Sequence, residues 1–210
     1  MVKLLFLCRR RADLTHERYA ELLLGGHVPL ALRHHPTLRR YVVNVVEEAL
    51  AGAPPLDSIG ALSFDTLADY RERLYDSPEG ERAIQRDVAG FLGGADAYAT
   101  REHVVRAPGR PPRPAAKKLV ACIVRAPALA RDAFVREWLE RRVPALLRAP
   151  GVEAYVANLV EQRLAAAAPA YDGMAEIHVE GTAADGALRE SLEGVGLAHV
   201  YRVAEHVARG

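Results

Sequence analysis

The sequence predicts an α+β fold built from two copies of one module, and two observations support this prediction. The segment Lys3–Asn44 returns as Lys118–Asn158 with its landmark residues in the same order. Within each copy, short apolar runs alternate with stretches of helical periodicity, which is typical of mixed strands and helices. The matched landmarks are Tyr19 and Phe134, Pro29 and Pro144, Tyr41–Asn44 and Tyr155–Asn158, Asp57 and Asp172, and Glu102–Val104 and Glu205–Val207.

The first copy predicts the order strand, helix, strand, strand, helix, strand. Apolar runs predict strands at about 2–9, 39–47, 58–65 and 101–107. Helical periodicity predicts helices over about 15–34 and 66–90. This order is that of a ferredoxin-like module, and the second copy repeats it.

The first helix should begin at Thr15, a residue type that favours the N-cap position. Its second half contains Gly25, Gly26 and Pro29. Glycine costs about 1 kcal/mol relative to alanine in a helix, and proline removes a backbone hydrogen bond, so we expect a kink or break there. The apolar side of this helix is formed by Tyr19, Leu22, Leu23 and Leu30.

We expect residues 1–107 to form the first module, 108–116 a proline-rich linker and 117–210 the second module. An extended linker of this length spans roughly 30 Å. A four-stranded sheet with both helices on one face leaves its other face apolar, and so small a module cannot expose that face. We therefore expect the two sheets to pack face to face as an intramolecular pseudo-dimer. Such a chain can be a monomer, and exposed sheet edges leave a further homodimer open.

The composition favours a soluble globular protein and excludes some partners. Hydrophobic residues make up 50% and charged residues 26% of the 210 residues, and 28 Lys and Arg face 27 Asp and Glu. No strong positive field would gather nucleic acid or an anionic membrane. The apolar start is closed by Arg9–Arg11, far short of a signal or membrane segment. Cys8 and Cys122 fit core residues of a reducing compartment, so we expect a cytoplasmic protein without a disulfide.

A combination of motifs, whose landmarks recur in both copies, resembles the EthD family of dimeric α/β barrels. They are a start like MVKLLFLCRR, a helix with an aromatic residue followed by HVP, then TLRRYVVN, a third strand led by DS or DG, and EHVV near the end. The resemblance covers nearly the full length of both copies. This family and its neighbours include an ether-degradation accessory protein, cofactor-free muconolactone isomerases, and dehydratases or cyclases of polyketide and aromatic pathways. The resemblance implies a small pocket in each module, faced by the first-helix histidine and the second-strand tyrosine.

His27 is the first candidate for catalysis. Positions 19, 23, 27 and 30 share one helix face, so His27 should point at the sheet. An imidazole with an ordinary pKa of about 6.5 takes and returns a proton near neutrality. The alternative is a core histidine bonded to a backbone carbonyl. Tyr41 on the second strand can donate to a developing oxyanion, or it can simply fill the layer between helix and sheet.

Further candidates surround these two residues. His103 can be a second polar group near His27, or a structural residue that both copies need, and Asp57 can orient one of the two histidines. Arg40 belongs to a group of arginines that either form a solvated rim or attract a carboxylate or phosphate. Substrate contacts are expected from Tyr19, Leu23, Asn44, Phe64, Phe91 and Arg40.

The second module differs at the positions that carry chemistry. Arg142 stands where the first module has His27, and an arginine cannot serve as a base at ordinary pH. Tyr155 repeats Tyr41, and the family-like glutamate survives only as Glu176. We expect the first module to be the active half and the second to support it, with Arg142, Tyr155 and Glu176 as an altered second pocket in the alternative.

No metal or cofactor is expected. His34 and His35 are adjacent and diverge, no CxxC or HExxH pattern occurs, and the glycine pairs lack a phosphate-binding context. The sequence predicts a cofactor-independent enzyme that acts on a small, largely apolar carbonyl compound such as a lactone, a polyketide or an aromatic intermediate. Isomerisation, dehydration or cyclisation by proton transfer would suit. The alternatives are a non-catalytic binding accessory protein and a cofactor-free monooxygenase.

Overall fold

The computed structural model describes residues 1–50, 52–109, 116–180, 191 and 195–210. Most of the predicted linker, 110–115, lies outside the described residues. The second helix expected for the second copy falls in 181–194, where the structure describes Ser191 alone.

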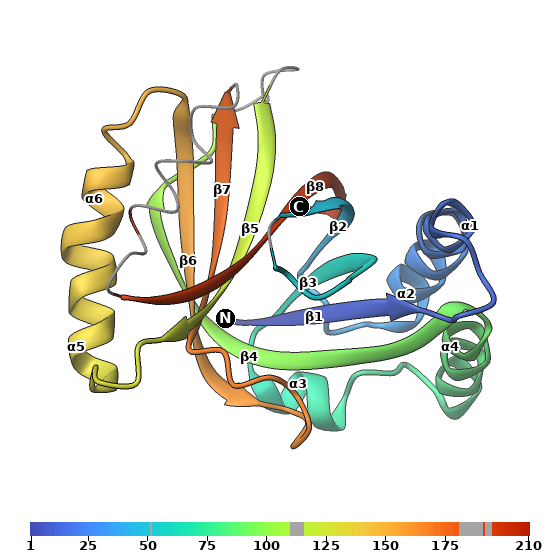
Figure 1. Cartoon of the computed structure of the whole chain (residues 1–210). Helices are drawn as coiled ribbons and strands as arrows, with labels where there is room; N and C mark the ends of the chain where they lie inside the picture. The colour runs from blue at the N-terminus through green and yellow to red at the C-terminus, as the bar shows by residue number, and fades with distance from the viewer. Residues whose placement is uncertain (51, 110–115, 181–190, 192–194) are drawn as a thin grey trace.

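Eight antiparallel strands form one closed barrel at the centre of the molecule (Figure 1). The order around the ring is β1-β3-β2-β8-β5-β7-β6-β4. The strands are β1 Val2–Arg10, β2 Arg40–Ala49, β3 Ser58–Phe64, β4 Leu92–Arg106, β5 Ala116–Arg125, β6 Val152–Arg163, β7 Gly173–Glu180 and β8 Gly196–Arg209.

The prediction of two sheets stacked face to face is incomplete, because the strands also join at both edges. The strands of residues 1–107, here called the first half, follow one another in the ring, as do those of residues 117–210, the second half. β2 pairs with β8, and β4 pairs with β6. These pairings satisfy the edge N–H and C=O groups that would otherwise be free, so the sheet edges predicted for further dimerisation are used within the chain.

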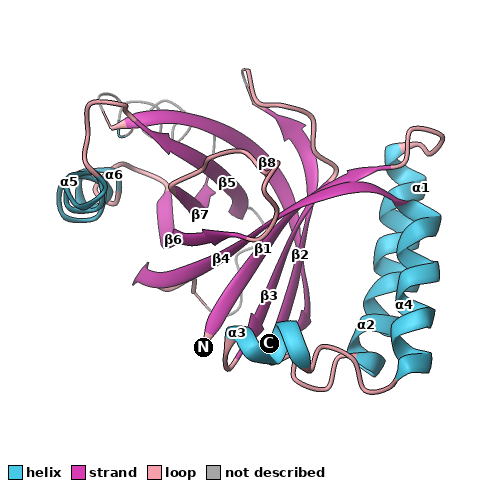
Figure 2. Ribbon diagram, turned by 90° about the horizontal axis from the view of Figure 1, so that it is seen from below, coloured by secondary structure: helices cyan, strands magenta, loops and turns pink. Residues whose placement is uncertain are grey.

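The helices lie outside the barrel in two layers on opposite sides (Figures 1 and 2). In the first half they are α1 His16–Glu21, a π-helical turn Leu22–His27, α2 Val28–His34, α3 Leu67–Glu72 and α4 Pro78–Phe91. In the second half they are α5 Arg131–Arg136, a π-helical turn Glu137–Arg142 and α6 Val143–Leu146.

The expected kink in the first helix is a π-helical turn, and its cause is the proline. In the first half the N–H of Val28 donates to the carbonyl of Leu23, five residues back, and Pro29 follows. The same bond runs from Val143 to Trp138 before Pro144, although the second half lacks the glycine pair. Because proline cannot donate to the carbonyl four residues earlier and crowds it, a wider turn accommodates it.

Two predicted elements have different bounds. The helix expected over 66–90 is two helices, because Ser77 caps a new start and Pro78 takes its first position. β4 begins at Leu92 rather than near 101 and pairs with β1 along this early part. Its glycines hide the strand pattern, yet Gly93 is needed: a Cβ there would lie 2.4 Å from the carbonyl oxygen of Arg10.

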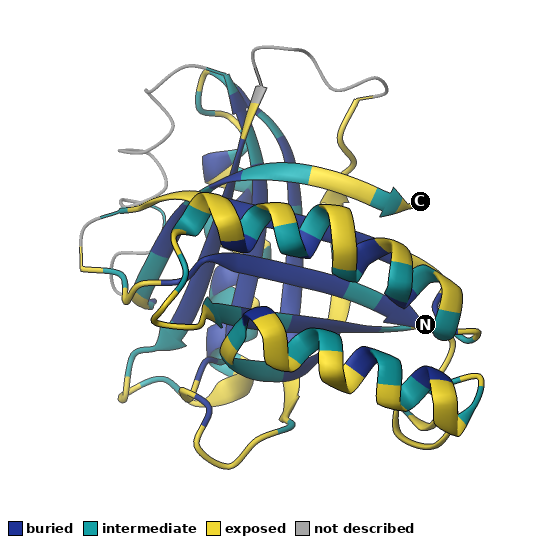
Figure 3. Ribbon diagram, turned by 90° about the vertical axis from the view of Figure 1, so that its right-hand side faces the viewer, coloured by how far each residue is buried: buried dark blue, intermediate teal, exposed yellow. Residues whose placement is uncertain are grey.

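The buried side chains form three layers. One cluster fills the barrel, including Leu5, Ile59 and Tyr201. The other two lie between the barrel and each helix layer. Figure 3 shows the first-half helices with their buried residues turned toward the strands. The first-half layer holds most of the residues that the sequence proposed for a site.

Candidate functional site

A cavity of about 230 Å³ lies between the barrel and the helices of the first half. Its wall on the helix side carries Tyr19, Leu23 and His27. The strands contribute Tyr41 from β2 and Gly60 from β3. The volume is just below the roughly 300–1,000 Å³ of sites for drug-sized ligands, so the cavity suits a molecule of about two or three rings.

His27 is positioned by the π-helical turn and by a carboxylate behind it. Its Nδ1 lies 2.8 Å from Oδ2 of Asp87 on α4, and its ring packs on Phe91 with centroids 5.3 Å apart. Burial lowers the pKa of His27 and outweighs the opposing effect of Asp87. A neutral ring that donates from Nδ1 to this carboxylate presents an unprotonated Nε2. No described residue bonds this nitrogen, which can therefore accept a hydrogen bond or a proton.

Tyr41 supplies a hydrogen-bond donor on the barrel side of the cavity. The residue is 4% exposed, and its hydroxyl has no hydrogen-bond partner among the described residues. Burial raises the pKa of Tyr41, so the phenol stays protonated at all ordinary pH values. A ligand oxygen in the cavity can therefore accept a hydrogen bond from Tyr41.

A second polar pair lies at the end of the cavity near β1. The hydroxyl of Tyr19 and Oγ of Ser58 are 2.7 Å apart, beside Cys8. Burial raises the pKa of the Cys8 thiol to about 11, so it is not a ready nucleophile. Cys8 and Cys122 are both free thiols; Cys122 packs inside the barrel, whereas Cys8 lines the cavity.

Five of the proposed residues line this cavity and three proposed substrate contacts do not. Phe64 is buried behind it, packed on Tyr70 with ring centroids 5.7 Å apart. Arg40 is exposed at the start of β2. Asn44 is in the barrel interior, where its Nδ2 donates to the carbonyl of Ile59. Those that line it are Tyr19, Leu23, His27, Tyr41 and Phe91.

Asp57 and His103 do not line this cavity, and Asp57 bonds neither His27 nor His103. Asp57 accepts from the backbone N–H of Arg10 and lies 3.0 Å from Nδ1 of His16. Burial raises the pKa of Asp57, but these partners outweigh it and lower the pKa. Asp57 thus fixes the end of β1 to the first helix. His103 lies on β4 opposite Ala157 of β6, with a buried Nε2 that no described residue bonds.

In the second half, aromatic side chains fill the corresponding space. Trp138 stands at the position of Leu23, is fully buried, and donates from Nε1 to the hydroxyl of Tyr155 at 2.9 Å. Gly173, at the position of Ser58, makes room for it, because a Cβ there would lie 2.4 Å from the indole ring. Arg142 instead bonds Glu137 at 2.9 Å at the helix surface. The second-half candidates therefore do not form one pocket.

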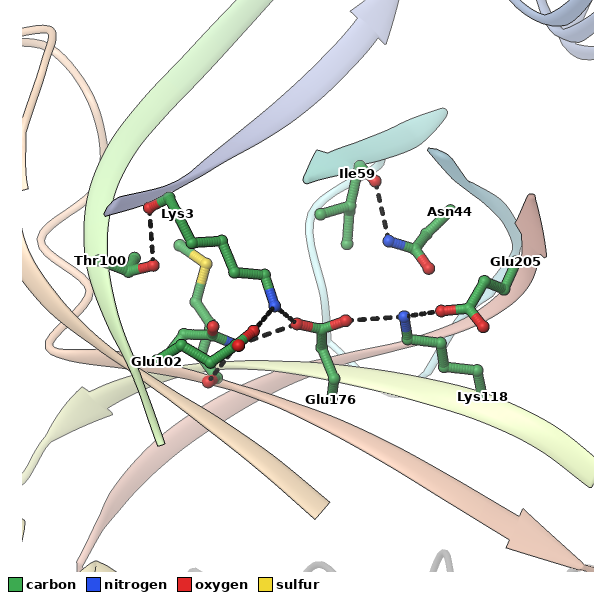
Figure 4. A network of polar contacts seen from close by, with 10 residues as sticks. Lys3, Asn44, Ile59, Thr100, Glu102, Lys118, Glu176 and Glu205 are labelled. Carbon is green, nitrogen blue, oxygen red and sulfur yellow. Dashed lines mark hydrogen bonds and ion pairs between the residues drawn. The ribbon is translucent and has the colours of Figure 1, made fainter. Parts of the chain in front are cut away.

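Glu176 belongs to a chain of five charged side chains, of which Lys3, Lys118 and Glu176 are buried (Figure 4). It lies between Lys3 and Lys118, bonding Lys3 closely and Lys118 at 2.7 Å. Each lysine also bonds a second carboxylate, Lys3 to Glu102 at 2.6 Å and Lys118 to Glu205. Burial raises the pKa of Glu176, but the two lysines outweigh it and hold the pKa well below its usual range. This chain joins strands of both halves.

Sequence reasoning missed three residues that shape the site. Asp87 interrupts the apolar side of α4 between Ile84 and Val88, and a carboxylate in such a stripe is the signal. His35 lies eight residues after His27 on the same helix face and also lines the cavity. Trp138 stands at the position that Leu23 has in the first copy, and this larger side chain could have predicted that the space is filled in the second copy.

No protein-family model matches the chain, and no curated protein matches it. Solved structures share its fold. An anthrone oxidase-like protein matches with a TM-score of 0.68 at 12% identity, over 99% of this chain and 93% of that one. A candidate monooxygenase from Fusobacterium nucleatum subsp. nucleatum gives 0.61 at 5% identity, over 99% and 92%. A mutant chlorite dismutase from Candidatus Nitrospira defluvii gives 0.56 at 12%, over 97% and 91%.

These likenesses define the fold class: the chain has the fold of the dimeric α/β barrel proteins. Among the residues that the structure describes, no three His, Cys, Asp or Glu side chains gather as a metal site. Within the same residues, no helix has the length and apolar character needed to cross a bilayer.

Proposed function

We propose that this chain is an EthD-like enzyme that removes a proton from carbon next to the carbonyl of a small, largely apolar substrate, without a cofactor. The observation that supports this most is the His27–Asp87 pair on the wall of an apolar cavity that also contains the free hydroxyl of Tyr41. One group accepts a proton and the other stabilises the oxygen on which negative charge develops.

The proposed step uses only these side chains. Nε2 of His27 takes the proton, and the electron pair of the broken C–H bond moves to the carbonyl oxygen to form an enolate. Tyr41 donates a hydrogen bond to that oxygen, and Asp87 stabilises the imidazolium through Nδ1–H. Return of the proton to another carbon completes an isomerisation. In a dehydration, the enolate electrons form the C=C bond as a β-hydroxyl leaves, and the His27 imidazolium protonates that hydroxyl so that it departs as water.

The names of the structural neighbours favour a second outcome of the same first step. An anthrone oxidase-like protein and a candidate monooxygenase share the fold. In this alternative dioxygen takes up the electrons of the enolate: a CH₂ group and O₂ become a C=O group and water, so atoms and electrons balance without a reductant. Oxygen consumption separates this alternative from isomerisation.

The first experiment measures hydrogen exchange, because it detects proton removal whatever follows. 1-Tetralone, an aryl ketone with an acidic CH₂, is incubated with the protein in D₂O without oxygen, and deuterium uptake is followed by NMR. We expect uptake above the buffer rate, reduced about 100-fold or more in His27→Ala. The matched control is Arg142→Ala, the counterpart in the second half, which should exchange like the wild type.

Equal exchange in the wild type and His27→Ala would contradict the proposed base. Binding of the ketone with no exchange in any variant would favour the accessory binding protein over an enzyme. Oxygen uptake on admission of air, with one O₂ consumed for each ketone formed, would favour the oxygenase.

A further inference from the structure

A second imidazole, that of His35, lines the same cavity. His35 directly follows α2 and lies on the helix face of His27 and Ala31. It is 5% exposed, and its ring packs on Tyr75 with centroids 5.4 Å apart.

The tautomer of His35 follows from its one hydrogen bond. Its Nδ1 lies 3.1 Å from the carbonyl oxygen of Leu74, and a carbonyl only accepts, so Nδ1 carries the proton. Burial lowers the pKa of His35, which keeps the ring neutral near pH 7. Nε2 is then an acceptor without a partner among the described residues, and the bond to Leu74 holds its direction.

The other residues that line the cavity determine which ligand groups can bind to Nε2 of His35. The residues that line the cavity include no Lys or Arg, and the nearby carboxylate of Asp87 is engaged by His27. An anionic ligand would meet two unprotonated ring nitrogens and no cation, and burying an unpaired charge is costly. A neutral hydroxyl group, in contrast, donates directly to such a nitrogen.

We propose that His35 determines specificity by accepting a hydrogen bond from a hydroxyl group of the substrate, so that the cavity selects neutral hydroxylated carbonyl compounds and discriminates against carboxylates. The assignment of the reacting carbon to His27 rests on the proposed function, whereas the role of His35 needs only binding. The substrate then has three points of attachment: the acidic carbon at His27, the carbonyl at Tyr41 and a hydroxyl at His35.

The test compares binding of related probes by isothermal titration calorimetry. The probes are 1-tetralone, its ring-hydroxylated isomers and the corresponding ring carboxylates. The variant is His35→Asn, whose amide can still donate to Leu74 but offers no acceptor at the position of Nε2. The control is His34→Asn, because His34 bonds Asp76 and does not line the cavity.

We expect at least one hydroxylated isomer to bind about tenfold more tightly than 1-tetralone, and His35→Asn to remove that advantage while 1-tetralone binds as before. The carboxylates should bind more weakly than the parent ketone. Equal losses for hydroxylated and parent probes, tight binding of a carboxylate, or no binding of any hydroxylated isomer would overturn the proposal. Because the readout is binding, an unchanged exchange rate in His27→Ala would remove the catalytic role alone.

Discussion

Among the described residues, the helix layers of the two halves differ in one respect: the first encloses a cavity, whereas Trp138 occupies the corresponding space in the second. Both have an aromatic residue at the first position of the helix stripe, Tyr19 or Phe134, and a tyrosine on the second strand. In the first half Leu23 leaves a cavity of about 230 Å³. In the second half Trp138 takes that space and bonds the hydroxyl of Tyr155.

The comparison teaches that side-chain volume, rather than backbone, distinguishes the two helix layers. Both halves have a π-helical turn before a proline and matching strands below it. A few side chains then determine whether the tyrosine hydroxyl faces a ligand or an indole. The changes below test this comparison, either in the helix layers or in the charge chain that joins the two halves.

The largest effect is expected from moving the filled arrangement into the first half. Tyr19→Phe, Leu23→Trp and Ser58→Gly together reproduce the residues found at 134, 138 and 173. The indole should occupy the cavity and take the hydroxyl of Tyr41, so binding of 1-tetralone should fall at least about 100-fold. Calorimetry measures the binding, and circular dichroism checks that the variant is folded. Retained affinity would place the ligand elsewhere.

Removing the charge of Glu176, whose counterpart in the first half is Ala61, should cost stability. Glu176→Gln leaves Lys3 and Lys118 with one carboxylate each, and breaking a buried ion pair costs about 3–5 kcal/mol. Urea unfolding at pH 7 measures this loss. A change below about 1 kcal/mol would contradict the role of the charge chain.

The same charge chain predicts how stability depends on pH. The folded pKa of Glu176 lies below its unfolded value, so its contribution is present above about pH 4.3 and is lost as the pH falls further. Burial lowers the pKa of Lys3, but Glu176 and Glu102 outweigh it and raise the pKa, so that contribution is lost only as the pH rises through the folded pKa. Glu176→Gln should therefore flatten the acid limb of a stability profile.

Removing the indole that fills the helix layer of the second half should reduce the free energy of unfolding by less than Glu176→Gln does. Trp138→Leu leaves a space beside Gly173 and removes the partner of the Tyr155 hydroxyl. We expect a loss of about 2–4 kcal/mol in urea unfolding, with unchanged binding of 1-tetralone in the first half. Weaker binding would show that the halves are coupled.

The smallest effect is expected on the pH dependence of the exchange rate at acidic pH. His27 must be unprotonated to accept a proton, so exchange should fall as the pH drops through a pKa below about 6.5. Asp87→Asn removes the partner that raises this pKa, so the limb should move to lower pH while the plateau rate decreases about tenfold or more. If the pH at which the exchange rate falls is the same in Asp87→Asn and the wild type, Asp87 does not act through His27.

Local patterns predicted the strands better than the contacts between distant elements. The predicted strands at 2–9, 39–47 and 58–65 agree with β1 to β3 within about two residues, because their apolar runs are dense. β4 was placed too late, since Gly93 and Gly94 have low strand propensity, and only the close approach of β1 requires Gly93. Closure of the barrel depends on pairings such as β4 with β6, which no local pattern specifies.

The candidate site was predictable where the helix face alone determined it. The stripe Tyr19, Leu23 and His27 points into the layer as expected, and Phe91 follows from the apolar side of α4. Asp57 and His103 were misplaced because their partners come from other strands and loops. Whether a layer is hollow depends on pairs distant in sequence, such as Trp138 and Gly173, and no single window contains both.

The chain of five charges centred on the buried Glu176 has a consequence for symmetry. Two identical subunits related by a two-fold axis contribute every side chain in pairs, so a pair of them cannot share one central carboxylate contributed by only one partner. Here Glu176 stands alone between Lys3 and Lys118, and Ala61 occupies the related position. Because both halves belong to one polypeptide, their sequences can differ and this unequal arrangement is possible. Two copies of the first half would have alanine at both related positions and would lack the central carboxylate.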